Sequence, residues 1–175
     1  MNLVSIRERP LLRRLRLLTA LFIAGLVLSG VTAIPLEQEV RWMREHLVGP
    51  APHSLAALAV VDQWLSRIHE ALRDTQARHL MLFYGTDWLA FGHFAIAIAF
   101  IGAWRDPVRN RWLFDFGLIA CALVVPYAMV FGAARGIPLW WRLVDCSFGV
   151  FGAVPLWICR RDARALEDLR AGTLH

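Results

Sequence analysis

Four long apolar runs constrain this chain more than any other feature of its sequence. They cover residues 17–34, 83–104, 112–132 and 137–159, and each is close to the ~20 residues that an α-helix needs to cross a hydrocarbon layer of ~30 Å. With 58% hydrophobic residues, the 175-residue chain holds more apolar surface than one soluble core would bury. The runs also lack the alternating pattern of barrel strands. We therefore predict an all-α, polytopic membrane protein with four transmembrane helices in a single membrane domain over residues 1–175.

The arginines predict the orientation, because positive side chains beside helix ends resist translocation. Most of them lie in residues 1–16, 105–111 and 160–175, which are expected to be two cytoplasmic tails and a cytoplasmic turn. Residues 35–82 hold five arginines against six acidic residues, and the turn 133–136 holds one arginine, so both segments are expected outside. The prediction is a multi-pass inner-membrane protein with both termini in the cytoplasm. Its net charge of +5 follows from this topology and predicts no nucleic-acid partner.

The first apolar run has an alternative interpretation as a secretory signal, since arginines precede it and Val31–Ala33 loosely resembles a cleavage site. The run is longer than the usual apolar core of a signal, and Pro35 disfavours cleavage. We expect this helix to be retained.

The outer, periplasmic segment 35–82 has a helical pattern of its own. After Pro35, apolar residues recur at helical spacing opposite charged ones, at Leu36, Val40, Met43 and Leu47. Gly49–Pro52 breaks the pattern, and Ser54 is a suitable cap for a second helix. The apolar face of that second helix consists of Val61, Trp64, Leu65, Ile68 and Leu72. Two amphipathic helices are predicted, which cover the bundle or lie on the membrane surface, with a partner-docking face as the alternative.

Ionisable residues inside the apolar runs are the most informative about function, because a charge in hydrocarbon costs on the order of 2.5–3.5 kcal/mol even on the lenient insertion scale. Asp115 lies four residues after Arg111, so an ion pair within one helix is expected to neutralise it.

A polar layer is predicted in the outer half of the bundle. At ~1.5 Å per residue, Asp145 lies ~10 Å below the start of the fourth run, and His93 lies ~15 Å below the start of the second. The candidate ligand-binding residues of this layer are Asp87, His93, Tyr127, Arg142 and Asp145. Two contacts are expected within it, an ion pair between Arg142 and Asp145 and a contact between His93 and Asp145.

Small residues predict which helix faces meet, because they let membrane helices approach closely. On the fourth helix Gly149 and Gly152 continue the stripe of Arg142 and Asp145. On the second helix the expected stripe consists of Gly92, Ala95, Ala99 and Gly102. The polar layer then has two interpretations, either a lock that holds the helices in register or a binding site open to the outer leaflet.

No cofactor is predicted. Cys121, Cys146 and Cys159 form no CxxC pair and are expected to be packing residues. His93 is the one histidine inside an apolar run, which disfavours a bis-histidine haem, and its neighbours lack the spacing of a metal site.

Three segments resemble blocks of a family of small uncharacterised bacterial four-helix inner-membrane proteins: TDWLAFGH at 86–93, RDPVRN at 105–110 and WRLVDCSFG at 141–149. The resemblance covers most of the chain, supports the topology and implies no activity. In architecture alone, the chain is also similar to the emopamil-binding and sigma-2-receptor-like proteins, which implies a lipid-like ligand.

The sequence therefore predicts a binding or accessory protein of the membrane, with a polar pocket in the outer half of the bundle. Its expected partners are the lipid bilayer, a lipid or hydrophobic small molecule, and a membrane protein or further copies of itself. The alternatives are a membrane-embedded enzyme that acts on a lipid or isoprenoid-like substrate and a small subunit of a larger membrane complex.

Overall fold

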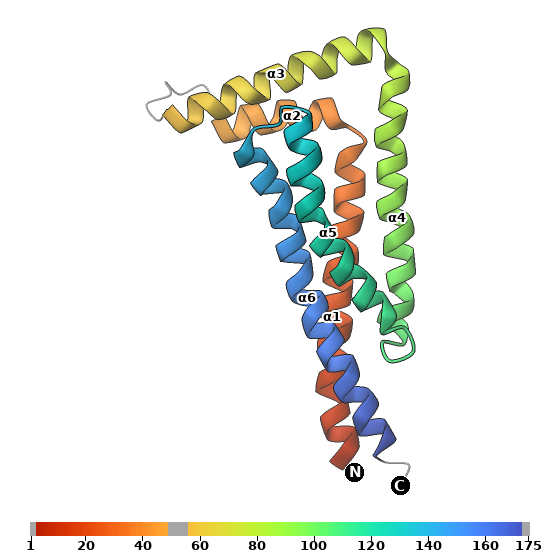
Figure 1. The fold of residues 1–175 in the computed structure, drawn as a ribbon. Helices are drawn as coiled ribbons and strands as arrows, with labels where there is room; N and C mark the ends of the chain where they lie inside the picture. Colours follow the sequence, from red (N-terminus) through yellow and green to blue (C-terminus); the bar gives the residue numbers. More distant parts are fainter. Residues whose placement is uncertain (1–2, 49–55, 173–175) are drawn as a thin grey trace. The chain divides into compact units, whose positions relative to one another are not determined.

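The computed structural model describes residues 3–48 and 56–172, and all of its regular elements there are helices. Their order is α1 (Leu3–Ala33), α2 (Leu36–Met43), the π-helical turn η1 (Arg44–Val48), α3 (Ala56–Arg78), the 3₁₀ turn η2 (Leu80–Leu82), α4 (Phe83–Arg105), α5 (Trp112–Ala134) and α6 (Leu139–Ala171) (Figure 1). The predicted breaker Gly49–Pro52 and the predicted cap Ser54 lie outside the described residues.

Four helices are long and apolar enough to cross a membrane, which confirms the four predicted crossings. They lie within Glu8–Ala33, Leu80–Arg105, Trp112–Ala134 and Leu139–Ala171. The chain is therefore a multi-pass helical membrane protein.

Two helices extend beyond the predicted membrane spans at the charged ends. α1 begins at Leu3, before the span predicted from residue 17, and α6 continues to Ala171, past the span predicted to end at 159. The extra turns are stable because their apolar residues join a buried cluster and several of their charges are paired, among them Arg14 with Asp162 and Arg170 with Glu8. Leu15, Ala163 and Leu166 are almost fully buried in that cluster.

The chain divides into two compact units. The first unit comprises Met1–Gly25 and Ile96–His175, and the second comprises Leu26–Ala95.

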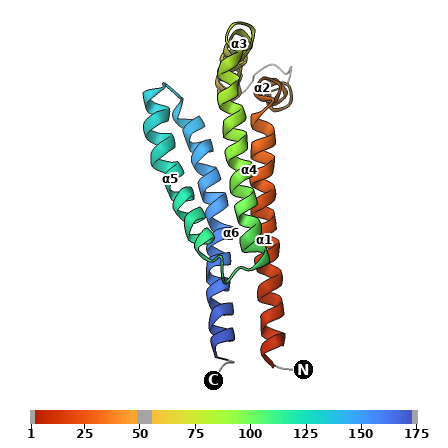
Figure 2. The same ribbon diagram turned by 90° about the vertical axis from the view of Figure 1, so that its right-hand side faces the viewer.

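The first unit is built on the antiparallel hairpin of α5 and α6, which lie side by side in both views (Figures 1 and 2). The close approach of α6 to α5 depends on glycines of α6. A Cβ at Gly149 would lie 2.6 Å from the backbone oxygen of Cys121, and one at Gly152 would lie 2.9 Å from its Sγ. The hairpin turns at Gly136, whose φ of 69° suits a residue without a side chain. The predicted contact face of α6 at Gly149 and Gly152 is thus confirmed.

The core of the first unit lies toward the charged end of its helices. Phe100 and Phe114 are fully buried there, and the ring of Phe22 lies 4.8 Å from that of Phe100 between centroids. The small-residue stripe predicted on the second helix is wrong at Ala95 and Ala99, which are exposed. The buried residues of α4 in this unit are Ala97, Phe100 and Ala103, so Phe100 turns a different face of the helix toward the core.

The turn between α4 and α5 is held by its own side chains. The Nδ2 atom of Asn110 donates to the backbone oxygens of Gly102 and Asp106 at 3.1 and 3.0 Å. The carboxylate of Asp106 accepts from the backbone N–H of Arg109 at 3.1 Å. These side-chain bonds add to the backbone bonds that the Gly102 and Asp106 oxygens already accept from Asp106 and Asn110, and they tie the turn to the end of α4.

In the second unit, α2 runs along α3 (Figure 1). Val40 of α2 and Leu65 of α3 are buried, and the guanidinium of Arg44 pairs with Asp62 at 2.9 Å. Nδ1 of His69 lies 3.6 Å from the Glu37 carboxylate. Elsewhere in this unit, a Cβ at Gly30 would lie 3.1 Å from the backbone oxygen of Ala90, so α1 and α4 approach closely at that glycine.

Replacing Gly149 by Ala should destabilise the first unit, because the added methyl would clash with the Cys121 backbone oxygen, which cannot turn away as a side chain can. We expect a loss of roughly 1–3 kcal/mol, measured as a lower midpoint of thermal unfolding in detergent. The control is Gly25→Ala in α1, where an added Cβ meets nothing within 4 Å. That control should match or exceed the wild-type midpoint, because Ala favours a helix over Gly by ~1 kcal/mol. Equal changes in the unfolding midpoint for Gly149→Ala and Gly25→Ala would contradict the close approach of α6 to the Cys121 backbone.

Burial raises the pKa of Glu39 in α2. Glu39 should therefore cost no stability where its carboxyl is protonated in both the folded and the unfolded state. Its cost should appear as the pH rises through the raised pKa, because the folded chain must then hold a poorly solvated carboxylate. We expect Glu39→Gln to raise the unfolding midpoint at pH 7 and to have no such effect near pH 3, about one unit below an ordinary carboxyl pKa. The exposed neighbour supplies the control, Glu45→Gln. If Glu39→Gln raises the unfolding midpoint equally at both pH values, the charge of the buried carboxylate is not the cause.

Candidate functional site

Of the five predicted site residues, three lie in the first unit, on α5 and α6. Tyr127 is 67% exposed, and its ring packs on that of Phe131 at 4.5 Å between centroids. Arg142 and Asp145 are half-buried on α6. This part of the predicted layer thus combines a phenol, a guanidinium and a carboxylate on two packed helices.

Arg142 is held by α5. Its aliphatic chain lies over Gly132, where an added Cβ would be 2.5 Å from its Cδ atom, and its Nη1 donates to the backbone oxygen of Met129 at 3.3 Å. Its Nε is buried and has no hydrogen-bond partner among the described residues. The predicted ion pair with Asp145 is wrong, because the space above Gly132 and the Met129 carbonyl draw the guanidinium toward α5.

Asp145 is left without that partner. Within residues 3–48 and 56–172 the structure gives its carboxylate no hydrogen bond and no ion pair, although it follows Leu139, the first residue of α6, by six positions and lies inside a candidate span. The residues that flank it toward the membrane, Leu143 and Val144, are exposed and apolar. A half-buried carboxylate in this setting is open to a group from outside the chain.

The other two predicted residues lie on α4 in the second unit. Asp87 is exposed. His93 is half-buried, and its Nδ1 lies 2.8 Å from the backbone oxygen of Leu89. Since a carbonyl only accepts, Nδ1 carries the proton, and Nε2 is the ring atom that can take up a second one. The predicted contact between His93 and Asp145 joins residues of different units and stays a prediction.

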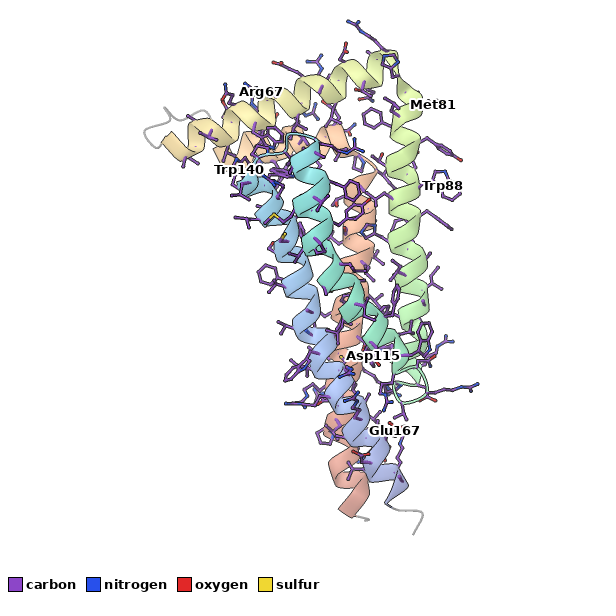
Figure 3. All side chains as sticks on the ribbon, viewed as in Figure 1. Arg67, Met81, Trp88, Asp115, Trp140 and Glu167 are labelled. Carbon is purple, nitrogen blue, oxygen red and sulfur yellow. The ribbon has the colours of Figure 1, made fainter. Side chains whose placement is uncertain are left out.

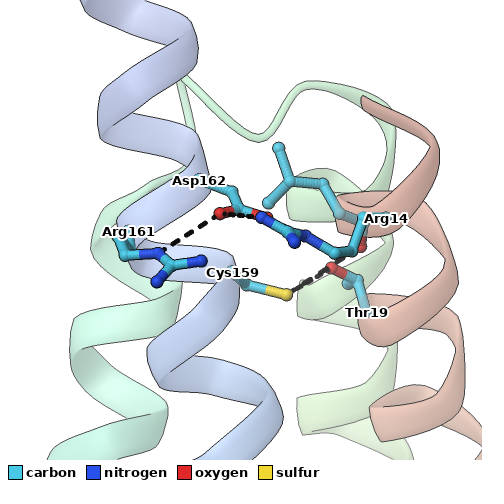
Figure 4. A network of polar contacts seen from close by, with 6 residues as sticks. Arg14, Thr19, Cys159, Arg161 and Asp162 are labelled. Carbon is cyan, nitrogen blue, oxygen red and sulfur yellow. Dashed lines mark hydrogen bonds and ion pairs between the residues drawn. The ribbon is translucent and has the colours of Figure 1, made fainter. Parts of the chain in front are cut away.

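A second polar cluster, which the sequence analysis missed, ties α1 to α6 (Figure 4). The guanidinium of Arg14 forms two hydrogen bonds with the carboxylate of Asp162, at 2.6 and 2.7 Å. Asp162 is 2% exposed, and Arg161 lies 3.6 Å from the same carboxylate. One turn away, Oγ1 of Thr19 and Sγ of Cys159 are 3.7 Å apart in the buried interface. The sequence signal was the stripe Leu156, Cys159, Ala163 and Leu166, which places Asp162 next to a helix contact.

Further ion pairs join the same end of the first unit. Asp115 of α5 pairs with Arg160 of α6, and Arg111 pairs with Glu167. The predicted partnership of Asp115 with Arg111 is therefore wrong: each finds a partner across the helix interface. Glu8 accepts from Arg170 at 2.7 Å. Asp115 and Glu167 lie toward the same end of the unit in Figure 3.

The three cysteines behave as packing residues. All are free thiols, Cys146 and Cys159 are buried, and Cys121 touches Gly152. Among the described residues, no group of three His, Cys, Asp or Glu side chains is arranged to hold a metal ion.

No protein-family model, curated protein or solved structure matches the chain. The resemblance to small bacterial four-helix inner-membrane proteins accordingly stays a prediction.

The pair of Arg14 and Asp162 yields a stability prediction. Arg14→Gln removes the guanidinium that neutralises a buried carboxylate, which costs 3–5 kcal/mol for a fully buried pair. Because the Arg14 side chain is 48% exposed and Arg161 stays near, we expect about 1–3 kcal/mol here. Thermal unfolding in detergent measures the loss, and Arg13→Gln, which removes the same charge one residue away, is the control. If Arg13→Gln costs as much as Arg14→Gln, the pair does not hold the helices together.

Proposed function

We propose that this chain is a binding or accessory protein of the inner membrane that holds a lipid or a hydrophobic small molecule at a polar site in the outer half of α5 and α6. The observation that carries the proposal is the contrast among three aspartates of the first unit. Asp115 and Asp162 are each paired with arginine, whereas Asp145 has no partner among the described residues. A chain that neutralises two carboxylates and leaves a third open within a span is equipped to bind something there.

The chemistry of the site indicates the kind of ligand. The carboxylate of Asp145 accepts hydrogen bonds or balances a cation, while the buried Nε of Arg142 has an N–H to donate. Tyr127 adds an exposed phenol and an aromatic face. The matching ligand has a small polar head with a donor and an acceptor, and an apolar body that lies against the exposed Leu143 and Val144. Asp87 and His93 lie on α4 in the second unit, and their part in ligand binding stays a separate prediction.

The orientation is part of the proposal. The arginine-rich segments 1–16, 105–111 and 160–175 carry the ion pairs that join α1, α5 and α6, and positive segments favour the cytoplasmic side. We infer that this end of the first unit is cytoplasmic, that both termini lie there, and that the helices α2 and α3 belong to a periplasmic segment with an amphipathic surface.

The two alternatives from the sequence, a lipid- or isoprenoid-directed enzyme and a small subunit of a larger complex, use the same features. Catalysis would need a proton acceptor at the site. A subunit would use Asp145 to receive a donor from a partner helix. The substitution Asp145→Asn tests both of these alternatives as well.

Replacing Asp145 by Asn should leave the fold intact and change what the protein retains. We expect an unchanged unfolding midpoint, because no internal partner is lost. Retention of the bound species should fall about tenfold, since a hydrogen bond to a charged group contributes ~1.5–3 kcal/mol. Lipids and small molecules extracted from the purified protein are compared by mass spectrometry, and native mass spectra report any partner chain.

The matched control is Asp168→Asn, the same change at an exposed position on the same helix. It should alter neither stability nor retention. Loss of the folded state in Asp145→Asn would show that the carboxylate holds the bundle in register, and unchanged retention would rule out a site at Asp145.

A further inference from the structure

A separate groove lies along the first turns of α1, far along the chain from Asp145. It has a volume of about 460 Å³, and Arg9, Arg13 and Arg16 line it together with Leu17, Ala20 and Trp104. All of these residues belong to the first unit. The groove is polar where the arginines lie and apolar toward Leu17 and Ala20, so it changes character along the helix.

The three arginines are exposed and follow one another at steps of four and three residues, which places them on one face of α1. Among the described residues, none of the three forms an ion pair. Other arginines of the same end do, at Arg14, Arg111, Arg160 and Arg170. Asp162, Glu167, Asp115 and Glu8 are thus used by other arginines, and the three arginines of the groove have no ion-pair partner among the described residues.

Trp104 forms one side of the groove. The guanidinium carbon of Arg16 lies 5.8 Å from the centroid of its ring, which is within the range of a cation–π contact. The indole is 40% exposed and lies at the end of α4, next to Arg105. Tryptophan favours the level of the lipid head groups, where one edge is polar and the other apolar.

We propose that this groove binds the phosphate of an anionic phospholipid from the leaflet that surrounds this end of α1. The guanidinium groups of Arg9, Arg13 and Arg16 donate to the phosphate oxygens, for which arginine's planar fork is well suited. An acyl chain of the same lipid lies along Leu17 and Ala20, where the apolar run of α1 begins. Basic pockets beside transmembrane helices recognise anionic head groups by this combination of charge and apolar contact.

The apolar part of the groove is the reason to assign a lipid rather than free phosphate. A small anion would satisfy the arginines but would leave the exposed Leu17 side chain uncovered. The position of the groove along α1 also favours a phospholipid. Arg16 and Leu17 are adjacent and mark the change from charged to apolar residues within the candidate span Glu8–Ala33. In a phospholipid, the charged phosphate is likewise followed by apolar acyl chains.

The test is a native mass spectrometric titration of the full chain in detergent with dioleoyl phosphatidylglycerol or dioleoyl phosphatidylcholine. For the wild type we expect the first phosphatidylglycerol to bind about tenfold more tightly, an amount equivalent to one or two charge-assisted contacts. The variant R9Q/R13Q/R16Q should lose this preference. The control variant R105Q/R109Q/R164Q removes three exposed arginines from the same end but outside the groove and should keep it.

Two further measurements keep the proposal open to refutation. The variant R9K/R13K/R16K retains the charge that orients the protein in the membrane but loses the guanidinium fork, so its preference should be about threefold weaker than that of the wild type. Glycerol phosphate in excess should fail to displace the lipid.

Several outcomes would overturn the assignment: a wild type without preference, an equal loss in both glutamine variants, or displacement by glycerol phosphate. Equal loss would indicate diffuse attraction to the whole charged end, and displacement would indicate a site for a soluble phosphate. None of these results bears on Asp145, so this inference and the proposed function can fail separately.

Discussion

The neutralisation of Asp162 is the constraint on which the first unit depends. A carboxylate with 2% exposure is tolerable in a helix interface only if a cation meets it with good geometry, and Arg14 does so through two hydrogen bonds. Because these bonds are directional, they fix the register of α1 against α6. The buried contact of Thr19 with Cys159 follows one turn away, and the cluster around Phe100 and Phe114 fills the space between these helices and their neighbours.

The charges of the first unit are distributed unevenly along its helices. At one end, carboxylates and guanidinium groups satisfy one another across helix interfaces. Farther along α6, Arg142 turns to a carbonyl on α5 and Asp145 has no partner among the described residues. Paired charges make an interface specific and rigid, whereas an unsatisfied polar group in a low-dielectric setting interacts strongly with whatever reaches it. The same residue types therefore serve packing at one end and, in the function proposed above, recognition at the other.

The sequence was sufficient for the number and approximate position of the spanning helices, since continuous apolar runs have few other solutions. It was also sufficient for the close approach at Gly149 and Gly152. It was insufficient for the partners of charged residues. Arg111 and Asp115 satisfy the spacing of a pair within one helix, but spacing does not reveal that Glu167 and Arg160 are within reach on α6. Asp162 was missed because its neighbours Arg160 and Arg161 gave the segment the composition of a cytoplasmic tail.

The continuation of α6 past Cys159 has a mechanical consequence. Twelve further helical residues extend it by about 18 Å, and the pair of Arg170 with Glu8 fastens this extension to the start of α1. Within the described residues, the start of α1 and the end of α6 are thus joined by two ion pairs, Glu8 with Arg170 and Arg14 with Asp162. A substitution that breaks either pair should therefore loosen both helices at this end, because each pair joins α1 to α6.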